Sequence, residues 1–162
     1  MQENYFQGTK EAPAHISIGG VLQNDKGEIA CHYFEKFSHF GEEANDFYLL
    51  MRETIEPNES IETCLMRGFQ EEFGAEATIE KFLGSIVCQA PKADFEIQKT
   101  TLYFLCDLIS IEESRRKDGD PERGSEIRWV KPEKVIPIMK EQAIRLGRKD
   151  IDESSILERL IA

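Results

Sequence analysis

The segment from residue 52 to 75, RETIEPNESIETCLMRGFQEEFGA, constrains the fold more than any other part of the 162-residue chain. After a Pro-Asn turn, Ser60 is a residue type that caps helix N-termini. Apolar side chains then recur at every fourth position, and Gly74 stands where a C-terminal cap belongs. The segment therefore predicts an amphipathic helix from about residue 60 to residue 73.

Two adjacent glutamates, Glu71 and Glu72, lie near the end of this helix. Positions three and four apart share a helix face, so these two are expected to cluster with Arg67 and Gly68, opposite the apolar stripe. Neighbouring carboxylates repel, which raises a pKa unless a cation is present. Mg²⁺ prefers oxygen ligands and binds carboxylates together with phosphates. The pair therefore indicates either a magnesium and phosphate site or an ordinary solvated helix face.

The remaining sequence predicts a sheet with further helices. A hairpin is expected from residue 15 to 35 with its turn at NDKG, and a short strand over 47–51. Strands over 77–90 and 98–110 should form a second hairpin, and EIRWV a last strand. Helices are expected over 132–148, limited by Pro137 and Gly147, and over 152–162. Loops should span 36–46 and 112–125, the second a mobile surface loop.

This order of elements indicates one mixed α/β sheet with helices on its faces. The GxGxxG spacing of a Rossmann fold is absent from the first strand. The opening MQENYFQG resembles an affinity-tag protease site, so residues 1–8 are interpreted as a tag remnant and 9–162 as a single domain.

Composition limits the partners that the chain can have. The net charge of −11 argues against binding a nucleic-acid backbone, which would need clustered Lys and Arg. No apolar run approaches the roughly 20 residues that span a bilayer, so a soluble protein is expected and no membrane partner. If this acidic protein binds phosphates, it needs a divalent cation to bridge them.

The four cysteines are widely spaced and form no CxxC pair. Cys31, Cys64, Cys88 and Cys106 are interpreted as buried thiols in a reducing compartment, here the cytoplasm, rather than as a disulfide or zinc framework.

With these residues in view, the carboxylate segment resembles the Nudix box of the Nudix hydrolases. That box reads Gly, five residues, Glu, seven residues, and then Arg-Glu-U-x-Glu-Glu-x-Gly-U, where U is aliphatic. Here Glu59 is followed after seven residues by Arg67, and Phe69, Glu71, Glu72, Gly74 and Ala75 continue in register. The first hairpin and GSEIRWVKPEKV also resemble the family, so the likeness covers roughly residues 14 to 140.

The sequence departs from the box at several positions. Glu53 stands at the first Gly, Met51 replaces the Pro before the glycine pair, and Asn58 replaces a turn Gly. Gly68 replaces the Glu that follows Arg, which in the family is commonly a metal ligand or the catalytic base. Two other carboxylates are candidates to replace it, Glu53 in the loop leading to the helix and Glu126 in a late loop or strand, with ordinary surface charge as the alternative for each.

The resemblance implies a Nudix-type α/β/α sandwich with a mixed β-sheet. It implies Mg²⁺-dependent hydrolysis, with Mn²⁺ as a substitute, of a nucleoside diphosphate linked to another moiety. Glu71 and Glu72 would be metal ligands and Arg67 would orient them. Glu59 would brace the loop, or would form only a structural ion pair with Arg67.

Because position 68 lacks the glutamate, a second hypothesis is a catalytically impaired Nudix-fold module with a nucleotide-binding or regulatory role. A scaffold without any ligand is the third. The expected partner is a small nucleotide or diphosphate substrate, with a homodimer as a candidate assembly. Substrate choice would lie in the two loops, 36–46 and 112–125, which carry no readable signature.

Overall fold

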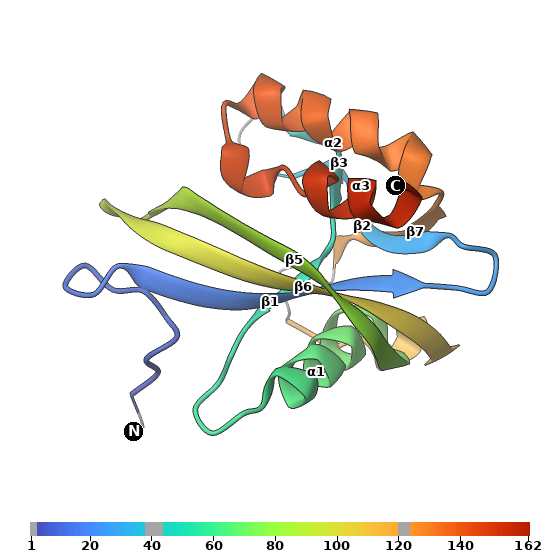
Figure 1. Cartoon of the computed structure of the whole chain (residues 1–162), viewed down its shortest axis with the longest axis horizontal. Coiled ribbons are helices and arrows are strands. Elements are labelled where there is room, and N and C mark those ends of the chain that lie inside the picture. Colours follow the sequence, from blue (N-terminus) through green and yellow to red (C-terminus); the bar gives the residue numbers. More distant parts are fainter. Residues whose placement is uncertain (1–2, 38–43, 120–123) are drawn as a thin grey trace.

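In the computed structural model, which describes residues 3–37, 44–119 and 124–162, a mixed seven-stranded sheet separates α1 from α2 and α3 (Figure 1). Two short 3-10 helices span 113–115 and 149–151. This arrangement confirms the predicted α/β/α class. The elements are β1 (Ala14–Gln23), β2 (Ile29–Lys36), β3 (Asn45–Leu49), β4 (Met51–Thr54), α1 (Ile61–Phe73), β5 (Ala75–Lys92), β6 (Phe95–Ile111), β7 (Glu126–Val130), α2 (Pro132–Leu146) and α3 (Ser154–Ile161).

The sheet has two halves that meet along β1. β1 runs parallel to β6 over its whole length and antiparallel to β4, whereas β2 pairs with β3 and β7. β1 and β2 are joined at the expected turn, but they pair only at Gln23 and Ile29. The predicted first hairpin is therefore wrong beyond its turn, because each strand finds its main partners elsewhere in the chain.

The single strand predicted over 47–51 is two strands that break at Leu50. β3 stays beside β2, and β4 crosses to β1, where Glu53 pairs with Ile18. Glu53 was expected in a loop, so this placement on a strand is a correction. The break follows from partners far away in sequence, which local β-propensity does not contain.

The second hairpin is confirmed, with β5 and β6 paired antiparallel from Ala75 to Phe95. In α2 the expectation for Pro137 was wrong, because this proline lies inside the helix. Gly147 ends α2 as expected, with a left-handed φ of 62°.

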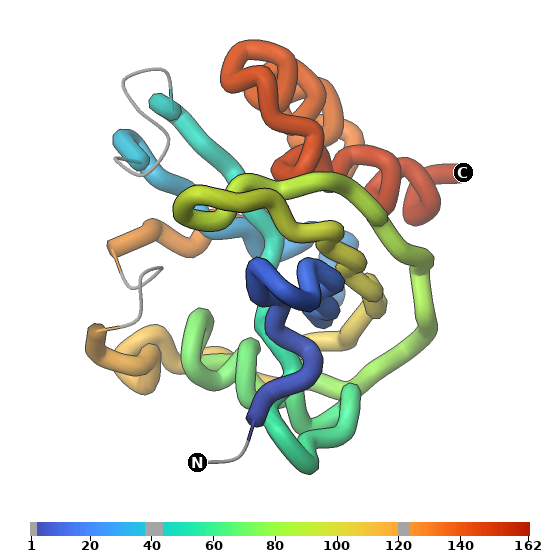
Figure 2. Tube along the Cα trace, turned by 90° about the vertical axis from the view of Figure 1, so that its left-hand side faces the viewer, coloured from blue at the N-terminus to red at the C-terminus, as the bar shows by residue number. Residues whose placement is uncertain are grey.

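The helices lie on opposite sides of the sheet (Figure 2), and an apolar layer holds each side against it. Under α1, Leu65, Phe69 and Phe73 are fully buried against Ile18 and Leu22. Burying a side chain of this size stabilises the fold by about 1.5–3 kcal/mol. The second layer packs α2 and α3 onto the opposite face, with Val135, Met139, Leu157 and Leu105 among its members. The helix that carries the carboxylates is thus fixed to the sheet.

All four cysteines are free thiols. Burial is confirmed for Cys31, Cys64 and Cys106, whereas Cys88 is only half-buried on β5. Burial is the largest cause that raises the thiol pKa of Cys64 and of Cys106 to about 12, so these thiols stay protonated.

The predicted loop 112–125 is only partly a surface loop. It contains the 3-10 helix at 113–115, and both Arg116 and Ser125 are 5% exposed. Residues 38–43 and 120–123, which belong to the two expected specificity loops, lie outside the described residues. Across the described ranges, none of the helices combines the length and apolar composition that crossing a bilayer requires.

Candidate active site

Helix α1 sets the direction of the carboxylates through its two ends. The Ser60 side chain accepts a hydrogen bond from the Thr63 N–H at 3.1 Å, and Gly74 closes the helix with a left-handed φ of 66°. In this orientation Glu72 turns inward, its side chain 3% exposed, while Glu71 lies at the edge at 24%. Glu72 thus shares a face with Gly68, four positions away, as expected, but this face is buried rather than opposite the apolar stripe, and Glu71 diverges from it by about 100°.

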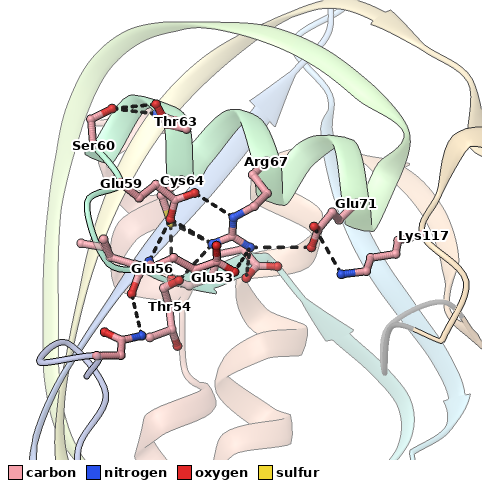
Figure 3. Close-up of polar contacts among 12 residues, drawn as sticks. Glu53, Thr54, Glu56, Glu59, Ser60, Thr63, Cys64, Arg67, Glu71 and Lys117 are labelled. Carbon is pink, nitrogen blue, oxygen red and sulfur yellow. Dashed lines mark hydrogen bonds and ion pairs between the residues drawn. The ribbon is translucent and has the colours of Figure 1, made fainter. Parts of the chain in front are cut away.

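Arg67 holds the strand, the turn and the helix together (Figure 3). Its Nε donates to Glu59 Oε1 at 2.7 Å, and the terminal nitrogens donate to Glu53 Oε2 at 3.1 Å and the Thr54 carbonyl at 3.0 Å. Glu71 Oε2 lies 3.6 Å from the same guanidinium. The hydrogen bond from Arg67 lowers the pKa of Glu59, so this carboxylate is charged at neutral pH.

Glu53 occupies space that Gly68 leaves open. A Cβ at position 68 would lie 2.7 Å from Glu53 Cγ and 2.6 Å from Met51 Sδ, so the glycine permits both side chains to approach the helix. Burial, the largest effect, raises the pKa of Glu53, although hydrogen bonds with Glu72 and Arg67 act in the opposite direction. A carboxylate from β4 thus lies beside the helix position that lacks one.

Glu72 is linked to a chain of buried polar groups that the sequence analysis missed. His32 Nε2 lies 2.6 Å from Glu72 Oε2, and its Nδ1 lies 2.6 Å from Ser125 Oγ. Arg116 donates to the same hydroxyl at 2.8 Å. The sequence signal for this network was the histidine within the apolar run IACHYF, because a buried polar group needs hydrogen-bond partners.

Glu126 lies on the other face of β7. In the register of β2 and β7, Glu126 is paired with Tyr33 and Ile127 with His32, so Glu126 lies on the Tyr33 face, away from His32 and Glu72. Its carboxylate accepts from Arg128 Nε at 3.2 Å, and that guanidinium lies over the Tyr33 ring at 3.4 Å from the centroid. The structure does not bring Glu126 to the other carboxylates.

The donor set fits a hard divalent cation by its chemistry. No three His, Cys, Asp or Glu side chains converge on a common metal position among the described residues. Mg²⁺ commonly takes only one or two protein carboxylates and fills its shell with water and phosphate oxygens. Glu72 lies close enough to Glu53 to affect its pKa, and Glu71 precedes Glu72 on the same helix, so carboxylate oxygens suited to such a cation lie in one region.

Comparisons with known proteins identify the family of the chain. The NUDIX domain model matches residues 13–151, and the chain therefore belongs to the NUDIX domain family. Members of this family are typically hydrolases of nucleoside diphosphates linked to another moiety, and they generally use divalent metal ions. No curated protein matches the sequence.

Solved structures share the fold at low sequence identity. A NUDIX hydrolase from Nitrosomonas europaea is 15% identical with a TM-score of 0.60, covering 90% of this chain and 87% of that one. The E. coli ORF135 protein is 16% identical with a TM-score of 0.57, with the same coverage of 90% and 87%. A MutT protein from Methanosarcina mazei Go1 is 18% identical with a TM-score of 0.53, covering 90% and 91%.

Proposed function

We propose that the protein is a Mg²⁺-dependent hydrolase that cleaves a nucleoside diphosphate linked to another moiety. The observation that supports this most is the position of Glu53, whose side chain lies against Gly68 and beside Glu72. The chain lacks the box glutamate at position 68, but a carboxylate from β4 lies in its vicinity. The loss of that residue therefore does not remove the acidic group from the site.

Of the carboxylates Glu53, Glu71 and Glu72, one or two would bind the metal ion, Mg²⁺ or Mn²⁺, because no three converge on one position among the described residues. When bound, it would neutralise charge on the phosphates and lower the pKa of a bound water. The hydrogen bond with His32 orients one oxygen of Glu72. Arg67 positions Glu53 and, through Glu59, fixes the turn before the helix.

Glu126 pairs with Arg128 on the face of β7 that points away from Glu72. A role for Glu126 as a metal ligand would therefore require this pair to open. The variant Glu126→Gln measures this role directly. If metal affinity falls as much as in Glu72→Gln, Glu126 belongs to the site.

The second candidate function is a module that binds the nucleotide without cleaving it. One observation favours it: the carboxylates already have protein partners, with Arg67 beside Glu53 and Glu71, and His32 beside Glu72. In such a module these carboxylates would pair with Arg67 and His32 instead of binding a metal cation.

To test this, the protein is incubated with Mg²⁺ or Mn²⁺ and a panel of nucleoside triphosphates, ADP-ribose, dinucleoside polyphosphates and nucleotide sugars. Products are separated by chromatography. The Glu72→Gln variant removes the inward carboxylate, and Glu62→Gln on the exposed face of the same helix is the matched control. We expect turnover that requires metal, is lost in Glu72→Gln and is kept in Glu62→Gln.

Binding of a panel compound without turnover in the wild-type protein would overturn the hydrolase proposal and support the binding module. The remaining expectations are tested alongside it. The compound panel identifies the small nucleotide-linked substrate. Imaging tests the cytoplasmic location, and sedimentation tests the homodimer.

A further inference from the structure

A small cavity lies where the chain crosses from one half of the sheet to the other. It has a volume of about 130 Å³ and is lined by His32, Leu49, Leu50, Arg52, Glu72 and Lys99. β3 ends and β4 begins at this point, so the two halves diverge and leave the space between them. The cavity therefore brings Glu72 together with two cationic side chains, Arg52 and Lys99.

Lys99 is an unusual residue for this position. It lies on β6, on the same face as the buried residues Thr101 and Tyr103, and it is itself half-buried. No hydrogen bond or salt bridge joins its ammonium to any residue in the part of the chain that the structure describes. Burial, and next the charge of Arg52, lower its pKa to about 8, so the protein destabilises the charged form.

The acidic residues near Lys99 are engaged with other groups. Glu153 accepts hydrogen bonds from the Leu50 N–H at 2.9 Å and the Tyr103 hydroxyl at 2.5 Å, and Arg52 Nε lies 3.9 Å from it. Asp150 pairs with Arg148. The ammonium of Lys99 therefore lacks a hydrogen-bonded acidic partner among the described residues.

Burial disfavours the charge of Arg52, but Glu153 and Glu72 raise its pKa, whereas burial and the charge of Arg52 both disfavour the charged form of Lys99. An anion would relieve both the repulsion and the desolvation, and Lys and Arg are the side chains that commonly bind phosphate oxygens. A cavity of about 130 Å³ is well below the roughly 300–1,000 Å³ of pockets that enclose a whole drug-sized ligand, so it suits one phosphoryl group and not a nucleoside.

We propose that Arg52 and Lys99 form an anion subsite that takes a phosphoryl group of the substrate. The assignment of this phosphoryl group to the substrate rests on the proposed function, because Glu72 lines the same cavity and would hold the metal. The substrate's diphosphate would then extend from the carboxylates toward Lys99, and its nucleoside would remain outside the cavity.

The test measures binding of inorganic pyrophosphate by isothermal titration calorimetry in EDTA, so that neither metal nor turnover is involved. Lys99→Met removes the charge at nearly constant size, and Lys99→Arg keeps the charge. Lys81→Met, at an exposed position on β5, removes an equal charge elsewhere. We expect binding in the wild-type protein, weakened about tenfold or more by Lys99→Met and retained by the other two variants.

Absence of pyrophosphate binding to the wild-type protein, or equal affinity in Lys99→Met, would overturn the subsite. The outcome is separate from that of the hydrolase assay. Binding that depends on Lys99 in a protein without turnover would support the subsite and reject the hydrolase, and turnover with affinity independent of Lys99 would do the reverse.

Discussion

Two positions, 53 and 68, exchange residue types relative to the Nudix box: the glycine of the loop is Glu53 and the glutamate of the helix is Gly68. They are in contact, since a Cβ at 68 would lie 2.7 Å from Glu53 Cγ. This contact gives the exchange a physical basis, because a side chain at one position occupies the space needed by the other.

The exchange predicts strong coupling between the two residues. Gly68→Glu alone should lower the free energy of unfolding by roughly 1–3 kcal/mol, because it crowds Met51 and Glu53 and adds a charge. Combining it with Glu53→Gly should recover at least about 1 kcal/mol of that loss. Urea unfolding of the wild-type protein, both single variants and the double variant measures the coupling. Effects that add within about 0.5 kcal/mol would show that the positions are independent.

Lys99 carries a prediction on stability and pH. Its pKa falls from the ordinary 10.5 to about 8 on folding, so below pH 8 both states are charged and the folded state bears the full penalty. Between these values only the unfolded state binds the proton, and stability rises with pH. The groups facing Lys99 that enter this balance are Arg52, Glu153, Asp150, Cys88 and His15.

Lys99→Met should therefore raise the free energy of unfolding at pH 7 by about 1–2 kcal/mol. This gain should shrink as pH increases from about 8 to 10.5, where the wild-type protein loses its penalty. Urea denaturation across this range measures the difference. A variant that is less stable at pH 7 would show that the ammonium makes a stabilising contact.

Among the secondary-structure elements, the ends of helix α1 determine where the site forms. Gly74 adopts a left-handed conformation, and a Cβ there would lie 2.1 Å from the Glu112 carbonyl oxygen. Backbone cannot move away as a flexible side chain can. The close approach of α1 to the start of the 112–125 stretch therefore requires glycine.

Gly74→Ala should lower the free energy of unfolding by about 2–4 kcal/mol, from the left-handed φ and the steric clash together. Gly147→Ala is the matched control, with a similar φ of 62° and no described atom within 4 Å of its Cβ. It should cost only about 1–2 kcal/mol. Equal losses in thermal or urea unfolding would mean that the contact with Glu112 does not constrain the helix end.

Local sequence signals were enough to predict some helices and strands but not others. Local signals were sufficient for α1, where Ser60, the apolar spacing and Gly74 defined a helix observed from Ile61 to Phe73. They failed at Leu50, where one apolar run divides between two partner strands. They also failed for Pro137, since packing of α2 on the sheet outweighs the lost hydrogen bond.

For the whole molecule, the sequence motif identified the family, but the site needs the tertiary structure. β4 contributes Glu53, α1 contributes Arg67 and Glu72, and β2 contributes His32. The pairing of His32 with Glu72 joins residues 40 positions apart, so no local pattern could contain it. The sandwich brings these groups to the place where the two halves of the sheet diverge.

We propose that the carboxylates of β4 and α1 together bind a divalent cation. Isothermal titration calorimetry with Mn²⁺ on the wild-type protein, Glu53→Gln, Glu72→Gln and the control Glu62→Gln tests it without requiring a known substrate. We predict one site whose affinity falls about tenfold or more in the first two variants and stays unchanged in the control. Equal Mn²⁺ affinity in all four proteins would contradict a metal site formed by Glu53 and Glu72.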